Sequence, residues 1–255
     1  MNATRQDFTD KNVLVTGATS GIGLASARAF LARGARRVYI TGRNPEKLDQ
    51  ALQALGERAT GCLSDVARIS DLKVLKGVIE QRGDRLDVIF ANAGIAEYGS
   101  FGAVAEADFD ATFDINVKGV FFTVQTLLPL LNPGASIVLN ASIVANKGMA
   151  NLSVYSASKA AVRSFARSWA NDLKARQIRV NAISPGVTLT PIMQHGLGMD
   201  QSQIDAFSAY LKDAAPAGRM AGPEEIAAAV LFLASESASY VNGIELTVDG
   251  GLTQI

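Results

Sequence analysis

The sequence predicts a single doubly wound α/β domain, in which helices cover both faces of a mainly parallel seven-stranded sheet. Three observations support this prediction. Short apolar runs alternate with segments of helical spacing along the whole chain. A glycine-rich turn directly follows the first apolar run. No Pro-, Gly- or Ser-rich linker and no internal repeat divides the 255 residues, so we expect one domain over 1–255.

The elements follow in order from these patterns. The first strand is expected at 12–16, and the helix after the glycine-rich turn ends before Gly34. Asn44 is placed to cap the next helix, with Pro45 at its first position. The remaining strands are expected at 37–41, 59–63, 86–91, 135–140, 178–184 and 243–248. The helices are expected at 22–33, 44–55, 69–81, 109–131, 154–175 and 224–234.

Residues 187–222 form the least regular segment of the sequence. They follow a strand, so they lie near the carboxyl edge of the predicted sheet. Long connections of this kind are usually lids or binding loops. We expect this segment to cover a substrate site.

Composition argues against several functional classes. Lys plus Arg and Asp plus Glu are both 24, and this balance disfavours nucleic acid or anionic membrane as the main partner. Cys62, the only cysteine, is expected to be buried in a strand, and the single His195 leaves no His/Cys metal cluster. Residues 1–10 carry no apolar signal region, and 117–131 is too short and polar to span a bilayer. We expect a cytoplasmic protein without a metal.

The glycine-rich turn lies where a dinucleotide pyrophosphate binds in a βαβ unit. Glycines let the backbone approach the phosphates, and the helix N-terminus offers free N–H groups. The spacing is G-x3-G-x-G rather than the usual G-x-G-x-x-G, so the turn alone is a weak signal. The candidate cofactor-binding residues here are Gly17, Thr19, Ser20, Gly21, Ile22 and Gly23.

The end of the second strand indicates which cofactor binds. An acid at this point bonds the ribose 2′-hydroxyl of NAD, whereas an arginine accommodates the 2′-phosphate of NADP. The sequence here is Thr41-Gly42-Arg43, which has no acid and presents a guanidinium. We therefore expect NADP(H) in preference to NAD(H). The alternative is that Arg43 is an ordinary solvated loop residue.

Tyr155 and Lys159 are four residues apart on a predicted helix, so they face the same space. Ser142 stands after the strand that precedes this helix, and the three can converge on one carbonyl group. The phenol can exchange a proton, and the ammonium can lower the phenol's pKa. The alternative is a Lys that merely lies along a half-buried ring.

These motifs together resemble the short-chain dehydrogenase/reductase family over essentially the whole chain. Each motif is weak alone, but their order and spacing agree. They are Thr16 to Gly23, Asp65-Val66, Asn92-Ala93-Gly94, Asn116, Ser142, Tyr155 with Lys159, Pro185-Gly186 with Thr188, and Val248 to Gly251. The resemblance implies a Rossmann domain that binds a nicotinamide dinucleotide.

The resemblance also implies roles for the catalytic candidates. Tyr155 would be the proton donor in reduction, and Ser142 would hydrogen-bond the substrate oxygen. Lys159 would hold the nicotinamide ribose and depress the phenol's pKa. Asn116 would bind a water that links Lys159 to a proton relay. From the residues alone, Asn116 could equally cap or break a helix.

The remaining cofactor contacts are implied in the same way, with Asn92 mainly structural. They are Arg43, Asn44, Asp65, Val66, Asn92, Ala93, Gly94, Tyr155, Lys159, Pro185, Gly186, Val187 and Thr188, with Ile183 beside them. Simpler interpretations stay open, because Asp65 could cap the following helix and Thr188 could be a turn residue.

The candidate substrate pocket is apolar, which favours a hydrophobic or bulky ketone or secondary alcohol. Its residues are Ser142, Ile143, Val144, Met149, Leu152, Tyr155, Ile192, Met193 and Leu197. Beyond the family core, the chain most resembles bacterial NADPH-dependent alcohol dehydrogenases that accept bulky ketones. The first alternative is a 3-oxoacyl-carrier-protein reductase. The second is a non-catalytic NADP(H)-sensing or scaffold protein. The resemblance also implies a homotetramer.

Overall fold

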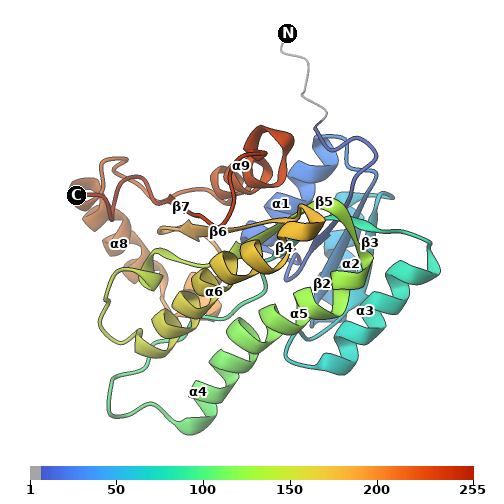
Figure 1. Cartoon of the computed structure of the whole chain (residues 1–255). Coiled ribbons are helices and arrows are strands. Elements are labelled where there is room, and N and C mark those ends of the chain that lie inside the picture. The colour runs from blue at the N-terminus through green and yellow to red at the C-terminus, as the bar shows by residue number, and fades with distance from the viewer. Residues whose placement is uncertain (1–6) are drawn as a thin grey trace.

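The computed structural model describes residues 7–255, so the expectations for residues 1–6 lie outside the described residues. Seven strands form one sheet in the order β3-β2-β1-β4-β5-β6-β7, and every strand pair is parallel (Figure 1). The strands are β1 (Asn12–Val15), β2 (Arg37–Gly42), β3 (Ala59–Leu63), β4 (Leu86–Ala91), β5 (Leu131–Asn140), β6 (Arg179–Pro185) and β7 (Glu245–Val248). The strand order reverses between β1 and β4, which is where ligands bind in doubly wound sheets.

Nine α-helices connect the strands within residues 7–255. They are α1 (Gly21–Ala32), α2 (Pro45–Leu55), α3 (Ile69–Gln81), α4 (Glu106–Phe113), α5 (Val120–Leu127), α6 (Ser153–Asp172), α7 (Ile192–His195), α8 (Gln201–Ala214) and α9 (Pro223–Ala234). None of these helices is both long and apolar enough to cross a membrane.

The central strands are buried on both faces because helices cover each side. Alternate residues of one strand enter two different cores: Leu14 packs towards α3, α5 and α6, whereas Val13 and Val15 pack towards α1, α2 and α9. Figure 1 shows α3, α5 and α6 on one face of the sheet and α1 and α9 on the other. Cys62 is buried in β3, as predicted.

The predicted helix over 109–131 is divided into several segments. A π-helical stretch, Asp114–Gly119, separates α4 from α5, and a 3-10 turn follows at Leu128–Leu130. β5 then begins at Leu131, earlier than expected. The wider π-helical turn carries the fully buried Asn116 into the interior. Turns of this kind are frequent at functional sites.

The expectation of an irregular segment over 187–222 is wrong in one respect, because α7 and the 14-residue α8 lie within it. A capping box begins α8: the Asp200 carboxylate accepts from the Gln203 N–H, and the Gln203 side chain accepts from the Asp200 N–H. Ile204 and Leu211 are buried beneath the helix. The D-x-x-Q pattern, followed by this apolar i, i+7 pair, is the sequence signal from which α8 could have been predicted. The C-terminus lies beside α8 (Figure 1), and the Ala217 N–H donates to the Gly250 carbonyl over 3.0 Å.

Candidate active site

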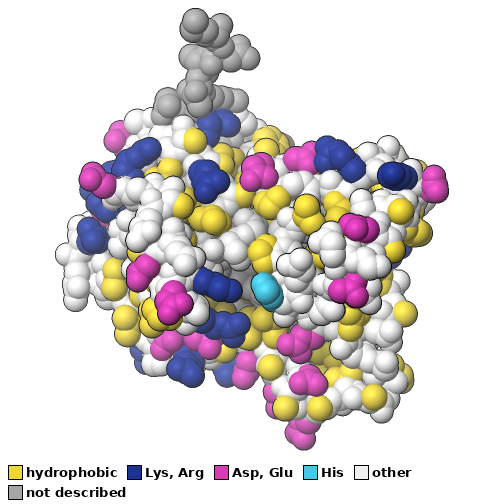
Figure 2. All heavy atoms as spheres, turned by 180° about the vertical axis from the view of Figure 1, so that it is seen from behind, with side chains coloured by type: hydrophobic (Ala, Val, Ile, Leu, Met, Phe, Trp, Pro, Cys, Tyr) yellow, Lys and Arg dark blue, Asp and Glu magenta, His cyan; other side chains and the backbone are white. Residues whose placement is uncertain are grey.

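A cleft of about 840 Å³ opens along the carboxyl edge of the sheet. Its lining extends from Arg43 and Lys47 after β2, past the glycine-rich turn, to Phe207 of the 187–222 segment and Leu252 near the C-terminus. Figure 2 faces a hollow in the middle of the molecule, with His195, the one histidine in the sequence, at its edge and Lys or Arg side chains beside it. The cleft therefore lies at the switch point of the sheet, where the sequence predicts a dinucleotide site.

The glycine-rich turn approaches its neighbours too closely for side chains. Gly17 has a φ of +62°, and a Cβ there would lie 2.9 Å from the Ala93 Cα. A Cβ on Gly23 would lie 2.4 Å from the Gly17 carbonyl oxygen. The Ser20 side chain makes no capping bond to α1. The first N–H groups of α1 therefore open onto the cleft, where they fit the phosphates of a dinucleotide.

Asn92 has a structural position, as predicted. Its amide nitrogen donates to the Thr16 and Gly17 carbonyls over 2.9 and 3.2 Å, and its oxygen accepts from Asn140 over 2.9 Å. The Thr16 hydroxyl accepts from the N–H groups of Asn92 and Ala93, both over 3.0 Å. These bonds fasten the end of β4 to the glycine-rich turn, and Asn92, Ala93 and Gly94 line the cleft.

Arg43 is exposed at the end of β2 and lines the cleft, together with Lys47 and Gln50 of α2. Sequence reasoning missed Lys47, although it stands one helical turn after Arg43. Asn44 is different, because its side chain accepts from the Lys47 N–H over 2.9 Å and caps α2. The structure therefore shows Asn44 as the cap that the sequence predicts, and its predicted contact with the cofactor stays a prediction.

Except for Ile183 of β6, which is fully buried in the core, the other predicted cofactor residues also reach the cleft. Asp65 and Val66 line it after β3, and Asp65 does not cap α3, whose N-cap is Arg68. At the end of β6 the lining residues are Pro185, Gly186, Val187 and Thr188. A Cβ on Gly186 would lie 2.6 Å from Asp249, so this glycine lets the closing loop pack against β6.

Ser142, Tyr155 and Lys159 converge beside the cleft. Tyr155 and Lys159 line it from α6, and the Lys159 Nζ lies 5.7 Å from the centroid of the Tyr155 ring. Ser142 is buried between Ala141 and Ile143, which line the cleft, and it hydrogen-bonds to the Tyr155 side chain. The Ser142 Oγ also accepts from the Val144 N–H over 3.4 Å.

The net shift of the phenol's pKa is upward, and the expected lowering by Lys159 stays a prediction. Burial raises the pKa of Tyr155 to about 12, and the hydrogen bond with Ser142 acts in the opposite direction. Burial lowers the pKa of Lys159 itself to about 8. Its Nζ donates to the Asn140 carbonyl over 2.7 Å. The dominant influence on both groups is thus desolvation rather than their mutual interaction.

Asn116 ties α6 to the segment that follows β4 and lines the cleft. Its oxygen accepts from the Ile95 N–H over 2.8 Å, and its nitrogen donates to the Ile95 carbonyl and to the Ser158 hydroxyl. A Cβ on Gly94 would lie 3.1 Å from the Asn116 oxygen and 3.3 Å from the Lys159 Nζ. The missing side chain of Gly94 leaves space between these two polar groups. The predicted water relay through Asn116 stays a prediction.

The remaining candidate substrate residues gather at the other end of the cleft. They are Ile143, Val144, Met149, Leu152, Ile192, Met193 and Leu197. Sequence reasoning missed Tyr98, Phe207, Tyr210 and Leu252, which also line this end. Phe207 and Tyr210 stack at 6.0 Å between centroids. Their i, i+3 spacing was visible in the sequence, but only recognition of α8 would have directed them towards the cleft.

Comparisons with known proteins place this chain in a family. A family model described as enoyl-(acyl carrier protein) reductase matches residues 17–253. The chain is 40% identical over 252 residues to oxidoreductase asL5 of Sarocladium schorii, with 98% of each chain covered. It is 35% identical to 3-oxoacyl-[acyl-carrier-protein] reductase FabG of Thermotoga maritima, over 95% of this chain and 97% of that protein. It is 36% identical to cyclopentanol dehydrogenase of Comamonas sp., over 96% of this chain and 97% of that protein. The chain belongs to the short-chain dehydrogenase/reductase family.

A solved structure agrees with this assignment. The crystal structure of levodione reductase matches with a TM-score of 0.88 at 31% identity, over 96% of this chain and 98% of that one. Membership of the short-chain dehydrogenase/reductase family makes the chain an oxidoreductase and implies a nicotinamide cofactor. The close-packed glycines and the open N-terminus of α1 fit such a cofactor. Among residues 7–255 there is no cluster of three or more His, Cys, Asp or Glu that could hold a metal.

The buried Lys159 predicts a pH-dependent stability difference in this oxidoreductase. Its pKa is lowered to about 8, so below that pH the folded protein carries the cost of a buried charge. Between about pH 8 and the ordinary value near 10.5 the unfolded chain binds more protons, so this cost disappears as the pH rises. At pH 7 the free energy of unfolding of Lys159→Met should therefore exceed that of wild type by up to about 3 kcal/mol, less a constant amount for the lost hydrogen bond to Asn140.

The measurement is the free energy of unfolding in urea at about pH 7 and pH 10 for wild type and variant. Lys147→Met, which removes an exposed lysine at the cleft, is the control. A difference between Lys159→Met and wild type that does not change with pH would contradict the argument.

Proposed function

We propose that this protein interconverts ketones and secondary alcohols with NADP(H), in preference to NAD(H). The observation that carries the proposal is the arrangement of one continuous cleft. Cations stand at one end, Tyr155 and Lys159 with the adjoining Ser142 lie in the middle, and apolar side chains line the other end. A dinucleotide would be held by the residues of the first two regions, and the substrate by those of the third.

The proposed mechanism assigns each side chain a task. The nicotinamide supplies or accepts the hydride when bound. Ser142 hydrogen-bonds the carbonyl oxygen, on which negative charge develops during reduction. Tyr155, whose high pKa keeps it protonated near neutral pH, donates a proton to that oxygen. Lys159 would hold the ribose hydroxyls of the cofactor, and Asn116 keeps α6 in place through Ser158.

The substrate end supports a hydrophobic and bulky substrate. Its lining is largely aliphatic and aromatic and includes Phe207 and the half-exposed Tyr98 and Tyr210. Binding is more favourable for a substrate that buries a large apolar surface against these rings. Cyclopentanol dehydrogenase and levodione reductase bear names that fit a cyclic alcohol and a ketone.

A panel of initial rates tests the proposal directly. Oxidation of NADPH and NADH would be followed with aryl ketones, aliphatic ketones and an acetoacetyl thioester. We expect fast NADPH oxidation with bulky ketones and a slower rate with NADH. A wild type that binds NADPH but reduces nothing across the panel would favour a non-catalytic sensor.

A 3-oxoacyl-carrier-protein reductase is the second candidate, because FabG of Thermotoga maritima is a relative over nearly the full length. Docking of an acidic carrier requires free cations near the cleft. Of the two candidate arginines on α6, Arg163 is paired with Glu245, whereas Arg167 is exposed, and Lys147 is an exposed lysine at the cleft. Activity with the thioester alone would assign the protein to this class.

We also propose a homotetramer. Phe121 of α5 and Phe165 and Trp169 of α6 form one aromatic cluster, and all three are only partly buried. Val120 and Leu127 belong to the core, so they do not support an interface. Light scattering gives the mass directly.

A further inference from the structure

Glu245 on β7 is a nearly buried carboxylate that joins three other segments. Its side chain is 9% exposed and forms an ion pair with Arg163. It accepts from the Ser184 hydroxyl over 2.5 Å. The Asn146 amide donates to both of its oxygens over 2.8 Å. No predicted role accounts for this cluster.

Each of the three donors stands close in sequence to a residue of the proposed site. Arg163 lies one helical turn after Lys159 on α6, so the two share a face. Asn146 ends the 3-10 turn Ile143–Ala145 that begins at Ser142. Ser184 directly precedes Pro185 at the cleft. The carboxylate therefore connects the segment carrying Ser142 to the helix carrying Tyr155 and Lys159.

We propose that Glu245 is a positioning residue. It holds the turn that begins at Ser142 against α6, so that Ser142 and Tyr155 can hydrogen-bond to the same substrate oxygen. This inference rests on the proposed function for its consequence, because the alignment matters only if these groups act on a carbonyl. Charge-assisted bonds to fixed donors are well suited to this task. A displacement of reacting groups by about 1 Å can cost roughly 100-fold in rate.

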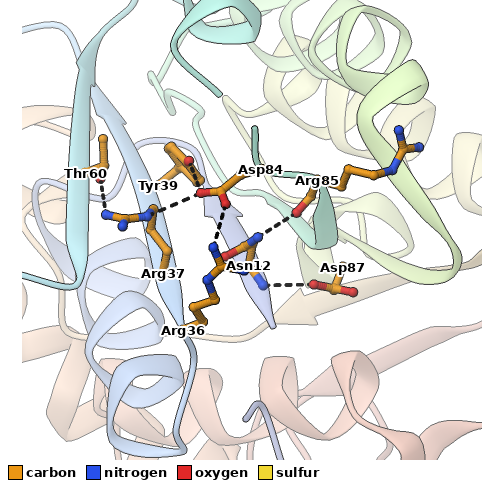
Figure 3. A network of polar contacts seen from close by, with 8 residues as sticks. All are labelled: Asn12, Arg36, Arg37, Tyr39, Thr60, Asp84, Arg85 and Asp87. Carbon is orange, nitrogen blue, oxygen red and sulfur yellow. Dashed lines mark hydrogen bonds and ion pairs between the residues drawn. The ribbon is translucent and has the colours of Figure 1, made fainter. Parts of the chain in front are cut away.

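The molecule contains a matched control just before the central strand β4. Asp84 is also a buried carboxylate, and its side chain is 4% exposed. It accepts from the Tyr39 hydroxyl over 2.6 Å and pairs with Arg36 and Arg37 at 3.3 Å (Figure 3). Asp84→Asn disturbs a comparable network that does not contact the cleft. It should lower the melting temperature but leave kcat unchanged.

The test is a double-mutant cycle between Glu245→Gln and Ser142→Ala. The Gln side chain keeps the shape of Glu but places an amide N–H against groups that are themselves donors. Glu245→Gln should lower kcat for ketone reduction by about 10-fold to 100-fold, while the Kd for NADPH changes by less than about twofold. In the Ser142→Ala background the same substitution should change kcat by less than about threefold, because the group it positions is gone.

An unchanged kcat in Glu245→Gln would overturn the proposal. So would an equal loss of kcat in the wild-type and Ser142→Ala backgrounds, because a general loss of stability gives additive effects. A crystal structure of Glu245→Gln supplies a readout independent of activity. We expect the 142–146 turn to shift relative to Tyr155, and an unmoved Ser142 would overturn the proposal. A wild-type protein that is inactive on every ketone would count against the proposed function. The crystal structure of Glu245→Gln would still show whether Glu245 positions Ser142.

Discussion

Tyr155→Phe should reduce the rate of ketone reduction by roughly 100-fold to 10,000-fold, the usual contribution of a general acid. The substitution removes only the phenolic oxygen and keeps the ring, which packs against the buried cluster that includes Ile143 and Val144. The Kd for NADPH should stay within about twofold of wild type, because the proposed contacts with the phosphates come from the glycine-rich turn. Single-turnover reduction with excess enzyme measures the chemical step, and fluorescence titration measures binding.

Tyr240→Phe is the control for this substitution, because Tyr240 is fully exposed and does not line the cleft. It should reduce ketones at the wild-type rate. If Tyr155→Phe kept more than about a tenth of the wild-type rate, Tyr155 would not be the proton donor. An equal loss of NADPH binding would indicate instead that Tyr155 serves mainly to hold the cofactor.

Gly42→Asp should shift cofactor preference from NADPH towards NADH by roughly 100-fold in the ratio of kcat/KM values, equivalent to about 2.8 kcal/mol. An acid at the end of β2 repels the 2′-phosphate that Arg43 is proposed to hold, and it can accept from the 2′-hydroxyl of NADH. The structure adds a steric consideration. A Cβ at position 42 would lie 2.3 Å from the Thr19 Cγ2, so the Thr19 side chain must rotate.

Gly42→Asn provides the matched control, since it introduces the same Cβ and nearly the same shape without the charge. It should lower kcat/KM with both cofactors by similar factors. A ratio that is the same in the Asp and Asn variants would show that charge at this position does not select the cofactor. Arg43→Ala tests the other half of the argument and should weaken NADPH use by about 10-fold or more, because a charge-assisted bond is lost.

Several features were determined by the sequence because they depend on local patterns. The alternation of apolar runs and helical segments predicts the parallel sheet, and all seven strands lie within a few residues of their expected places. The spacing of Tyr155 and Lys159 places both on one face of α6 wherever that helix packs. The Asn44 cap also follows from neighbouring residues alone.

Other features were decided only by the tertiary structure, because they arise from contacts between distant segments. The direction of the pKa shifts of Tyr155 and Lys159 depends on how completely the cleft walls exclude water, which no spacing reveals. The π-helical turn that buries Asn116 depends on packing against α6. Glu245 and its three donors are separated by 61 to 99 residues, so their cluster exists only once β6, β7 and α6 have come together.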